Sequence, residues 1–303
     1  MKDDYLWDRS GVPDPEVERL ERTLTPLRYR HRELRPRRAP SAGAAAMIAA
    51  VMAAAAGLVL MVAPAVQSTG WQVAGANLRT GQVLRTGSTA VTLEAASVGR
   101  VDLGPHSELK ASAAKKLTLQ RGELHAFIWA PAREFVVDTP SARAVDLGCE
   151  YTLNVDGKGD GVLRVKLGWV AFQVGDREAF IPAGAQCVTR RKGGPGIPYY
   201  EDAPVGLRDA VAAFERGDGA VLGTLLAAAR PHDGLTLWHL LTRVAERDRG
   251  AVFDRFRELV RLPDEVTREG VVRRDASAID RCWNALELEN TGWWRGWERK
   301  WSE

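Results

Sequence analysis

The longest uncharged stretch of the chain covers residues 41–66 and reads SAGAAAMIAAVMAAAAGLVLMVAPAV. A helix needs about 20 predominantly apolar residues to cross the hydrocarbon core of a bilayer. Six arginines stand between positions 28 and 38, and no Lys or Arg follows the run until Arg79. The positive-inside rule then places the N-terminus in the cytoplasm. Residues 41–66 are therefore predicted to form a single transmembrane helix, with a buried soluble helix and a cleaved signal peptide as the alternatives.

The preceding segment, residues 1–38, is too short for a hydrophobic core of its own, but it contains one amphipathic pattern. Asp14 can cap a helix, and Pro15 suits the first helical position. Four apolar residues then recur at helical spacing on one face, namely Val17, Leu20, Leu24 and Leu27. Such a stripe predicts a helix that binds a groove on a cytoplasmic protein. A helix that lies on the membrane or on a dimer mate is the alternative.

From residue 71 to residue 189 the pattern changes to short runs of alternating apolar and polar residues, such as STAVTLEA, EFVVDTP and EYTLNVDG. Alternation with period two, rich in β-branched residues and interrupted by Gly or Pro, is typical of strands. Residues 71–189 are therefore predicted to form an all-β domain. Asp156 and Gly157, with further glycines behind them, are predicted to connect a hairpin.

An internal repeat runs through this region. The sequence VDLG at 101–104 recurs at 145–148, and LTLQRG at 117–122 corresponds to LRVKLG at 163–168, each followed by a further strand pattern that ends in AF. Repeats of this period indicate stacked supersecondary units that share one core. A β-sandwich and a short solenoid-like stack both fit. In either, Gly122 and Gly168 are predicted to lie at bends or bulges.

These motifs resemble the FecR domain over about residues 80–190. The resemblance rests on an ordered set of stretches, which read GRVDLGPHSEL, LTLQRGEL, EFVVDTP, VDLGCEYTL, VKLGWVAF and IPAGA. It implies the extracytoplasmic sensing domain of a FecR-type sigma-factor regulator in a bacterial inner membrane. It also implies a cytoplasmic part that binds an extracytoplasmic-function sigma factor, and an outer part that receives a signal from an envelope protein.

The chain contains three cysteines, Cys149, Cys187 and Cys282. Cys149 and Cys187 would face an oxidising compartment, which makes a disulfide between them one expectation and two buried thiols the other. Cys282 is expected to pack within a helix. A thiol directly after Gly148 also suggests attack on the preceding carbonyl and self-cleavage. No His, Cys, Asp or Glu spacing predicts a metal site, and no motif predicts a cofactor or an enzyme.

Residues 190–204 are rich in Gly and Pro and are predicted to be a linker. Beyond it, residues 205–303 are predicted to form an all-α region, because apolar residues recur at helical spacing and Asp275 can cap a last helix. The tail places Trp293, Trp297 and Trp301 four residues apart, which gives an aromatic stripe on a helix. Docking on the body of the protein, contact with a partner and seating at the membrane interface all fit this stripe.

The whole pattern predicts a non-enzymatic membrane protein that senses an envelope signal and modulates a cytoplasmic partner. The net charge of +3 and the lack of a long basic patch away from the membrane argue against nucleic acid. The small residues around Ala53 to Gly57 suit a homodimer through the transmembrane helix. The alternative is a membrane-anchored envelope scaffold or binding module with no signalling role, which the shortness of residues 1–38 supports.

Overall fold

The computed structural model describes residue 19 and residues 70–288. The predicted transmembrane helix, the stripe from Val17 to Leu27 and the tail tryptophans lie outside the described residues. Within the part that is described, no helix is long and apolar enough to cross a membrane. The chain divides into two compact units, Met1–Pro64 and Ala65–Glu303. All strands and helices from β1 to α9 belong to the second unit.

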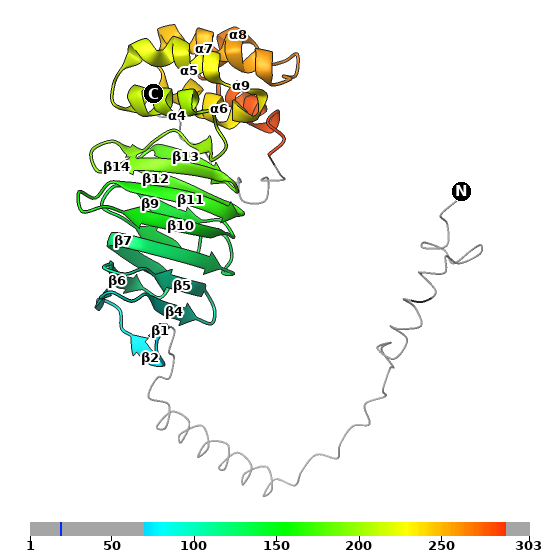
Figure 1. Cartoon of the computed structure of the whole chain (residues 1–303). Helices are drawn as coiled ribbons and strands as arrows, with labels where there is room; N and C mark the ends of the chain where they lie inside the picture. Colours follow the sequence, from blue (N-terminus) through cyan, green and yellow to red (C-terminus); the bar gives the residue numbers. More distant parts are fainter. Residues whose placement is uncertain (1–18, 20–69, 289–303) are drawn as a thin grey trace, which may run out of the picture. The chain divides into compact units, whose positions relative to one another are not determined.

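The described residues begin with a β region and end with helices, as the sequence predicts (Figure 1). The strands are β1 Trp71–Val73, β2 Ala76–Leu78, β3 Val83–Arg85, β4 Val91–Ala95, β5 Gly99–Leu103, β6 Glu108–Ala113, β7 Lys116–Ile128, β8 Val136–Asp138, β9 Arg143–Asp146, β10 Glu150–Val155, β11 Gly161–Leu167, β12 Trp169–Val174, β13 Arg177–Pro182, β14 Ala185–Arg190, β15 Gly194–Pro195 and β16 Tyr199–Tyr200. The helices are α4 Val205–Glu215, α5 Leu222–Ala228, α6 Gly234–Arg243, α7 Glu246–Leu259, α8 Arg268–Val272 and α9 Ala276–Asn284.

The strands form two sheets that are joined through β7. Sheet A has the order β2-β1-β4-β5-β7-β10-β11-β14, and β15 and β16 pair with β14. Sheet B has the order β3-β6-β7-β8-β9-β12-β13. Every pair is antiparallel except β7 with β8. The β region is therefore a stack of strands that bend from one sheet into the other, which combines features of both predicted alternatives.

Glycines occupy the bends, as predicted for Gly122 and Gly168. The first half of β7 pairs in sheet B and the second half in sheet A, with Gly122 between them at φ +97°. Gly168 separates β11 in sheet A from β12 in sheet B at φ +71°. A Cβ atom at Gly168 would lie 1.9 Å from the carbonyl oxygen of Gly148. Both positions thus need a residue without a side chain.

The two copies of the sequence repeat bend at opposite lateral edges of the stack. In the ladder between β7 and β10, Gly122 pairs with Val155 and Phe127 pairs with Glu150. The bend at Gly122 therefore lies at one end of these strands, and the bend at Gly148, just before β10, lies at the other. The hairpin predicted at Asp156 and Gly157 is confirmed, because β10 and β11 pair on either side of it.

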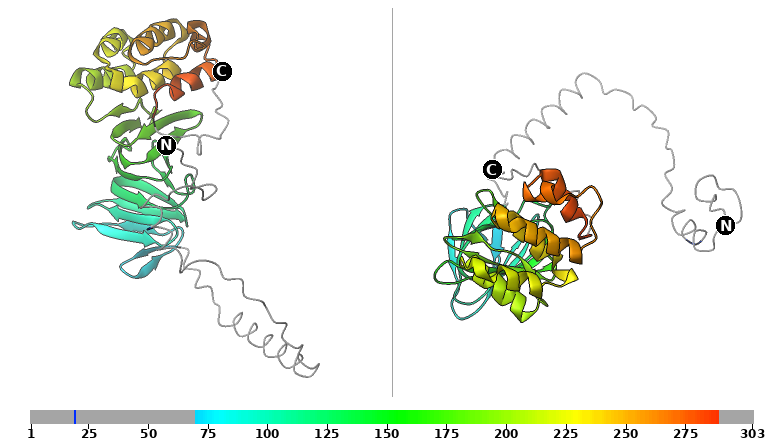
Figure 2. Two further views of the ribbon diagram at one scale, coloured as in Figure 1. Left: turned by 90° about the vertical axis from the view of Figure 1, so that its right-hand side faces the viewer. Right: turned by 90° about the horizontal axis from the view of Figure 1, so that it is seen from above.

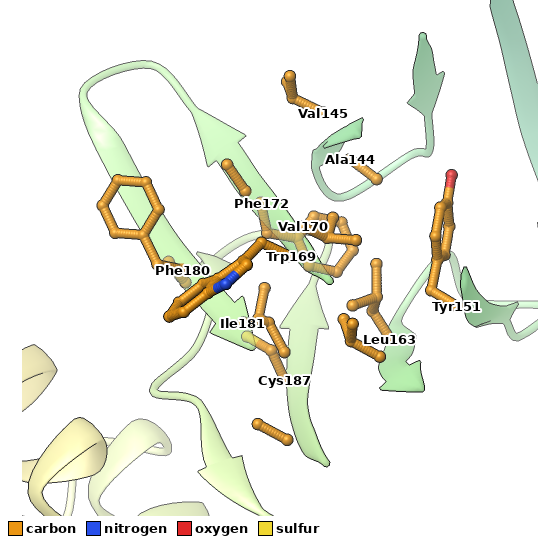
Figure 3. Close-up of a cluster of buried hydrophobic side chains, with 14 of the residues drawn as sticks. Ala144, Val145, Tyr151, Leu163, Trp169, Val170, Phe172, Phe180, Ile181 and Cys187 are labelled. Carbon is orange, nitrogen blue, oxygen red and sulfur yellow. The ribbon is translucent and has the colours of Figure 1, made fainter. Parts of the chain in front are cut away.

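The core fills the space between the sheets. Figure 3 shows Leu163, Val170 and Ile181 grouped with Tyr151 and Phe172 between strands of the two sheets. All five side chains are fully or almost fully buried. Alternate residues of β4, β5 and β10 point inward, which explains the period of two in the sequence.

The helical region follows the predicted stripes. Leu207 and Val211 of α4, Leu225 of α5, and Val252 and Phe256 of α7 are buried. Asp275 caps α9, since its side chain accepts a hydrogen bond from the Ala278 N–H at 2.9 Å. The short helix α8 was not predicted, because a helix of one turn is too brief to show a period.

The segment predicted as a linker, residues 190–204, is instead packed. It contributes β15 and β16 to sheet A, and Ile197 within it is buried. The sheets and the helices therefore belong to one compact unit. The Gly and Pro residues of this segment therefore form a packed connection between the sheets and the helices, not a flexible one.

Candidate functional site

The helices lie beyond one end of the β stack (Figure 2). There α6 bonds to the free edge of β13, the last strand of sheet B. The Phe180 backbone N–H donates to Nε2 of His239 at 3.0 Å, and Nδ1 of His239 lies 2.9 Å from the Leu235 carbonyl oxygen. Arg243 donates to the Glu178 carbonyl at 3.1 Å. Because His239 accepts at Nε2, it is a neutral imidazole that carries its proton on Nδ1. These side chains satisfy edge groups that would otherwise be free to pair with another strand.

An aromatic cluster fixes the same junction. Trp283 of α9 lies with its ring centroid 5.8 Å from that of Trp169 and 5.5 Å from that of Phe180. Trp238 of α6 joins at 4.6 Å from Trp283 and donates its indole N–H to the Ile279 carbonyl at 3.0 Å. Tilted and edge-on contacts at these distances stabilise aromatic pairs beyond their burial. A shift of the helices would therefore repack β12 and β13.

Two partly buried charged side chains, Arg243 and Glu215, bind residues 195–197, which lie between the sheets and the helices. Arg243 donates to the carbonyls of Pro195 at 2.8 Å and Gly196 at 3.2 Å, and the Glu215 carboxylate accepts from the Ile197 N–H. Burial lowers the pKa of Arg243 to about 10, so the guanidinium stays charged at neutral pH. Burial raises the pKa of the Glu215 carboxyl above its ordinary value.

The bend between β9 and β10 brings a carboxyl and a thiol together. Asp146 is fully buried, accepts from the Gly148 N–H at 2.8 Å, and accepts from the Cys149 thiol. Burial raises the pKa of Asp146 to about 7, and the two hydrogen bonds oppose that rise. Burial and the neighbouring carboxylate raise the pKa of the Cys149 thiol well above its ordinary value. The thiolate is the nucleophile, so this conformation disfavours the self-cleavage considered for Gly148 and Cys149.

The expected disulfide between Cys149 and Cys187 is not formed. Both are free buried thiols, as is Cys282. Cys187 pairs with Leu163 on β11, whereas Cys149 lies beside Gly168, past the other end of that strand. With about 3.3 Å per residue along a strand, the two Cα atoms are more than about 10 Å apart, beyond the reach of a disulfide. The sequence placed both cysteines at strand ends. It did not show the pairing register of the strands, which sets the distance between the two thiols.

No group of His, Cys, Asp and Glu side chains within residues 70–288 has the arrangement of a metal site. An open, polar hollow of about 390 Å³ lies beside the turn at Thr139–Ala142. Its Arg143 and Asp138 already pair with each other, at 2.7 Å.

The comparisons with known proteins give one distant likeness. No protein-family model and no curated protein matches the chain. Two crystal structures of a candidate anti-sigma factor from Parabacteroides distasonis ATCC 8503 are similar in fold, at 14% and 15% sequence identity and a TM-score of 0.35 for each. Each match covers 45% of this chain and 65% of that one. The function proposed below does not rest on this likeness.

Sequence reasoning missed His239, Arg243 and Asp146. His239 falls on the apolar stripe of α6, and its bond to Phe180 depends on a strand 59 positions earlier. Asp146 stands in the second VDLG motif, and nothing in that motif indicates its contact with Cys149. The matching Asp102 instead faces outward and bonds to Thr92 at 2.6 Å and Arg100 at 3.2 Å.

Proposed function

We propose that this protein is a single-pass signalling protein of the FecR-like type in a bacterial inner membrane. Residues 70–288 receive a signal outside the membrane. The helix that carries Val17, Leu20, Leu24 and Leu27 modulates a cytoplasmic partner, such as an extracytoplasmic-function sigma factor. The signal comes from an envelope protein, and the role needs no catalytic step or cofactor.

The observation that carries this proposal is the single core shared by the FecR-like motifs and the helices. The β stack and helices α4–α9 are joined by the aromatic cluster around Trp283 and by the bonds of His239 and Arg243. A ligand that binds either part changes the packing energy of the other, which is what a sensor requires. Strand β1, the first strand after residues 41–66 in the sequence, is part of sheet A.

Capture of partners from cells tests the proposal. The full-length protein serves as bait in its wild-type form and with Val17→Ser, Leu20→Ser and Leu24→Ser combined. We expect a sigma factor with the wild type and its loss with the triple variant, because the apolar face is the proposed contact. Val205→Ser, at a residue that is 61% exposed on α4, is the control and should change nothing.

Recovery of no sigma factor or other regulator by the wild type would refute the signalling role. The rival is an anchored scaffold or binding module. It predicts that the triple variant inserts into the membrane and leaves the cellular phenotype unchanged.

A further inference from the structure

Three large apolar side chains are exposed together on the outer face of sheet A. Phe127, Trp129 and Leu167, which we call the aromatic patch, are 45%, 51% and 57% exposed. The rings of Phe127 and Trp129 meet edge-on at 6.0 Å. Phe127 and Leu167 lie on either side of Glu150, with which both pair in the ladders of β10. Glu150, which pairs with Lys166 and His125, separates Leu167 from the two aromatic rings. Large exposed apolar side chains gathered beside polar residues in this way mark a contact surface.

Helix α9, the last described helix, is connected to this patch through a short series of contacts. Trp283 of α9 packs on Trp169, and Trp169 follows Gly168. A Cβ atom at Gly168 would lie 3.2 Å from the Cα of Cys149. The Cys149 carbonyl in turn accepts from the N–H of Ile128 at 3.1 Å, between the two aromatic residues of the patch.

The remaining chain is long enough to reach the patch. Neighbouring strands are about 4.8 Å apart, so the steps from Trp169 to β7 amount to roughly 15 Å. Residues 289–303 continue directly from Leu288. They would span about 22 Å as a helix and about 50 Å in extended form.

The chemistry of residues 289–303 matches the patch. Trp293, Trp294, Trp297 and Trp301 fall within this stretch. In a helix, the spacing of four residues would put Trp293, Trp297 and Trp301 on one face. Indole rings prefer to contact other aromatic rings at an offset or edge-on, which Phe127 and Trp129 offer. The tail carries equal numbers of basic and acidic side chains, so apolar contact rather than net charge would select the surface.

We propose that residues 289–303 fold back and seat their tryptophans on the aromatic patch of the same chain. The tail then covers Phe127, Trp129 and Leu167 and keeps other partners from this face of sheet A. This contact goes beyond the signalling role and does not depend on it.

Photo-crosslinking in the full-length protein tests the contact. Leu167 is replaced by p-benzoylphenylalanine, and the linked peptides are identified by mass spectrometry in a mixture of isotope-labelled and unlabelled copies. The matched control places the same crosslinker at Val83, which is 41% exposed on β3, far along the stack from the helices. We expect links from position 167 to residues 289–303 of the same copy, and none from position 83.

Three results would overturn the proposal. They are the absence of links to the tail from position 167, links that join labelled to unlabelled copies, and links to another protein or to lipid in place of the tail. Hydrogen exchange gives a second measurement. Phe127→Ser with Trp129→Ser should speed exchange of the tail amides about tenfold through loss of aromatic contacts, whereas Val174→Ser should not. Equal exchange in both variants would also contradict the contact.

Discussion

At the scale of single residues, the same motif places aspartate in two environments. Asp102 and Asp146 both stand in VDLG, yet Asp102 is partly exposed and pairs with Arg100, whereas Asp146 is fully buried beside Cys149. The pKa of Asp102 is lowered by its hydrogen bonds and charges, although burial opposes this. The pKa of Asp146 rises to about 7 because burial dominates. Tertiary packing, which a local motif does not encode, decides the difference.

The buried carboxyl makes stability depend on pH. The folded state holds the Asp146 proton up to about pH 7, whereas the unfolded chain releases it near pH 4. The free energy of unfolding should therefore fall as pH rises between these values, by at most about 1.4 kcal/mol per unit, and level off above. Asp146→Asn should remove this slope in urea unfolding between pH 5 and pH 8.

Glu215, whose pKa burial also raises, acts in the same direction. Its contribution is common to both proteins and cancels in the comparison. Equal slopes for wild type and Asp146→Asn would show that Asp146 is ionised in the folded state at pH 5.

At the scale of elements, the bends were predictable and the pairings were not. Gly122 and Gly168 interrupt strand patterns, and their positions follow from the sequence. The run EFVVDTP predicts the strand β8, but nothing in the sequence shows that β8 lies between β7 and β9 or that it pairs in parallel with β7. The pairing of Ala185 with Tyr200 and of Gln186 with Tyr199 likewise joins residues on either side of a Gly- and Pro-rich stretch that shows no strand pattern. The Gly and Pro content of residues 190–204 alone therefore led to the prediction of a linker.

A glycine at a bend and a glycine in a hairpin turn differ sharply in their tolerance of a side chain. Gly168→Ala would put Cβ against the Gly148 carbonyl and force alanine to φ +71°. We expect it to lower the free energy of unfolding by about 3 kcal/mol. Gly157→Ala, in the hairpin turn with no atom within 4 Å of the added Cβ, should stay within about 0.5 kcal/mol of wild type. Urea unfolding of both variants measures this, and similar values for the two would contradict the bend geometry.

At the scale of the whole described unit, sheets and helices should unfold together. Trp283→Ala removes the ring that contacts Trp169, Phe180 and Trp238. Truncation of a buried Trp costs about 3–5 kcal/mol, and here the loss should appear equally in both regions. Hydrogen exchange of α6 and of β12 during urea unfolding should give one common midpoint in both proteins. Separate midpoints in the wild type would mean that the two regions are independent domains.

The direction of the sheet hydrogen bonds has a mechanical consequence. Successive strands are stacked from β1 and β2 at one end to β13 and β14 at the other, so their ladders run along the stack. A tension applied through residue 70 would load the few pairs of β1 with β2 and β4 first. The opposite end is anchored by Arg243 and His239. Force would therefore peel the stack from its N-terminal strands, one ladder at a time, while the helical end kept its structure.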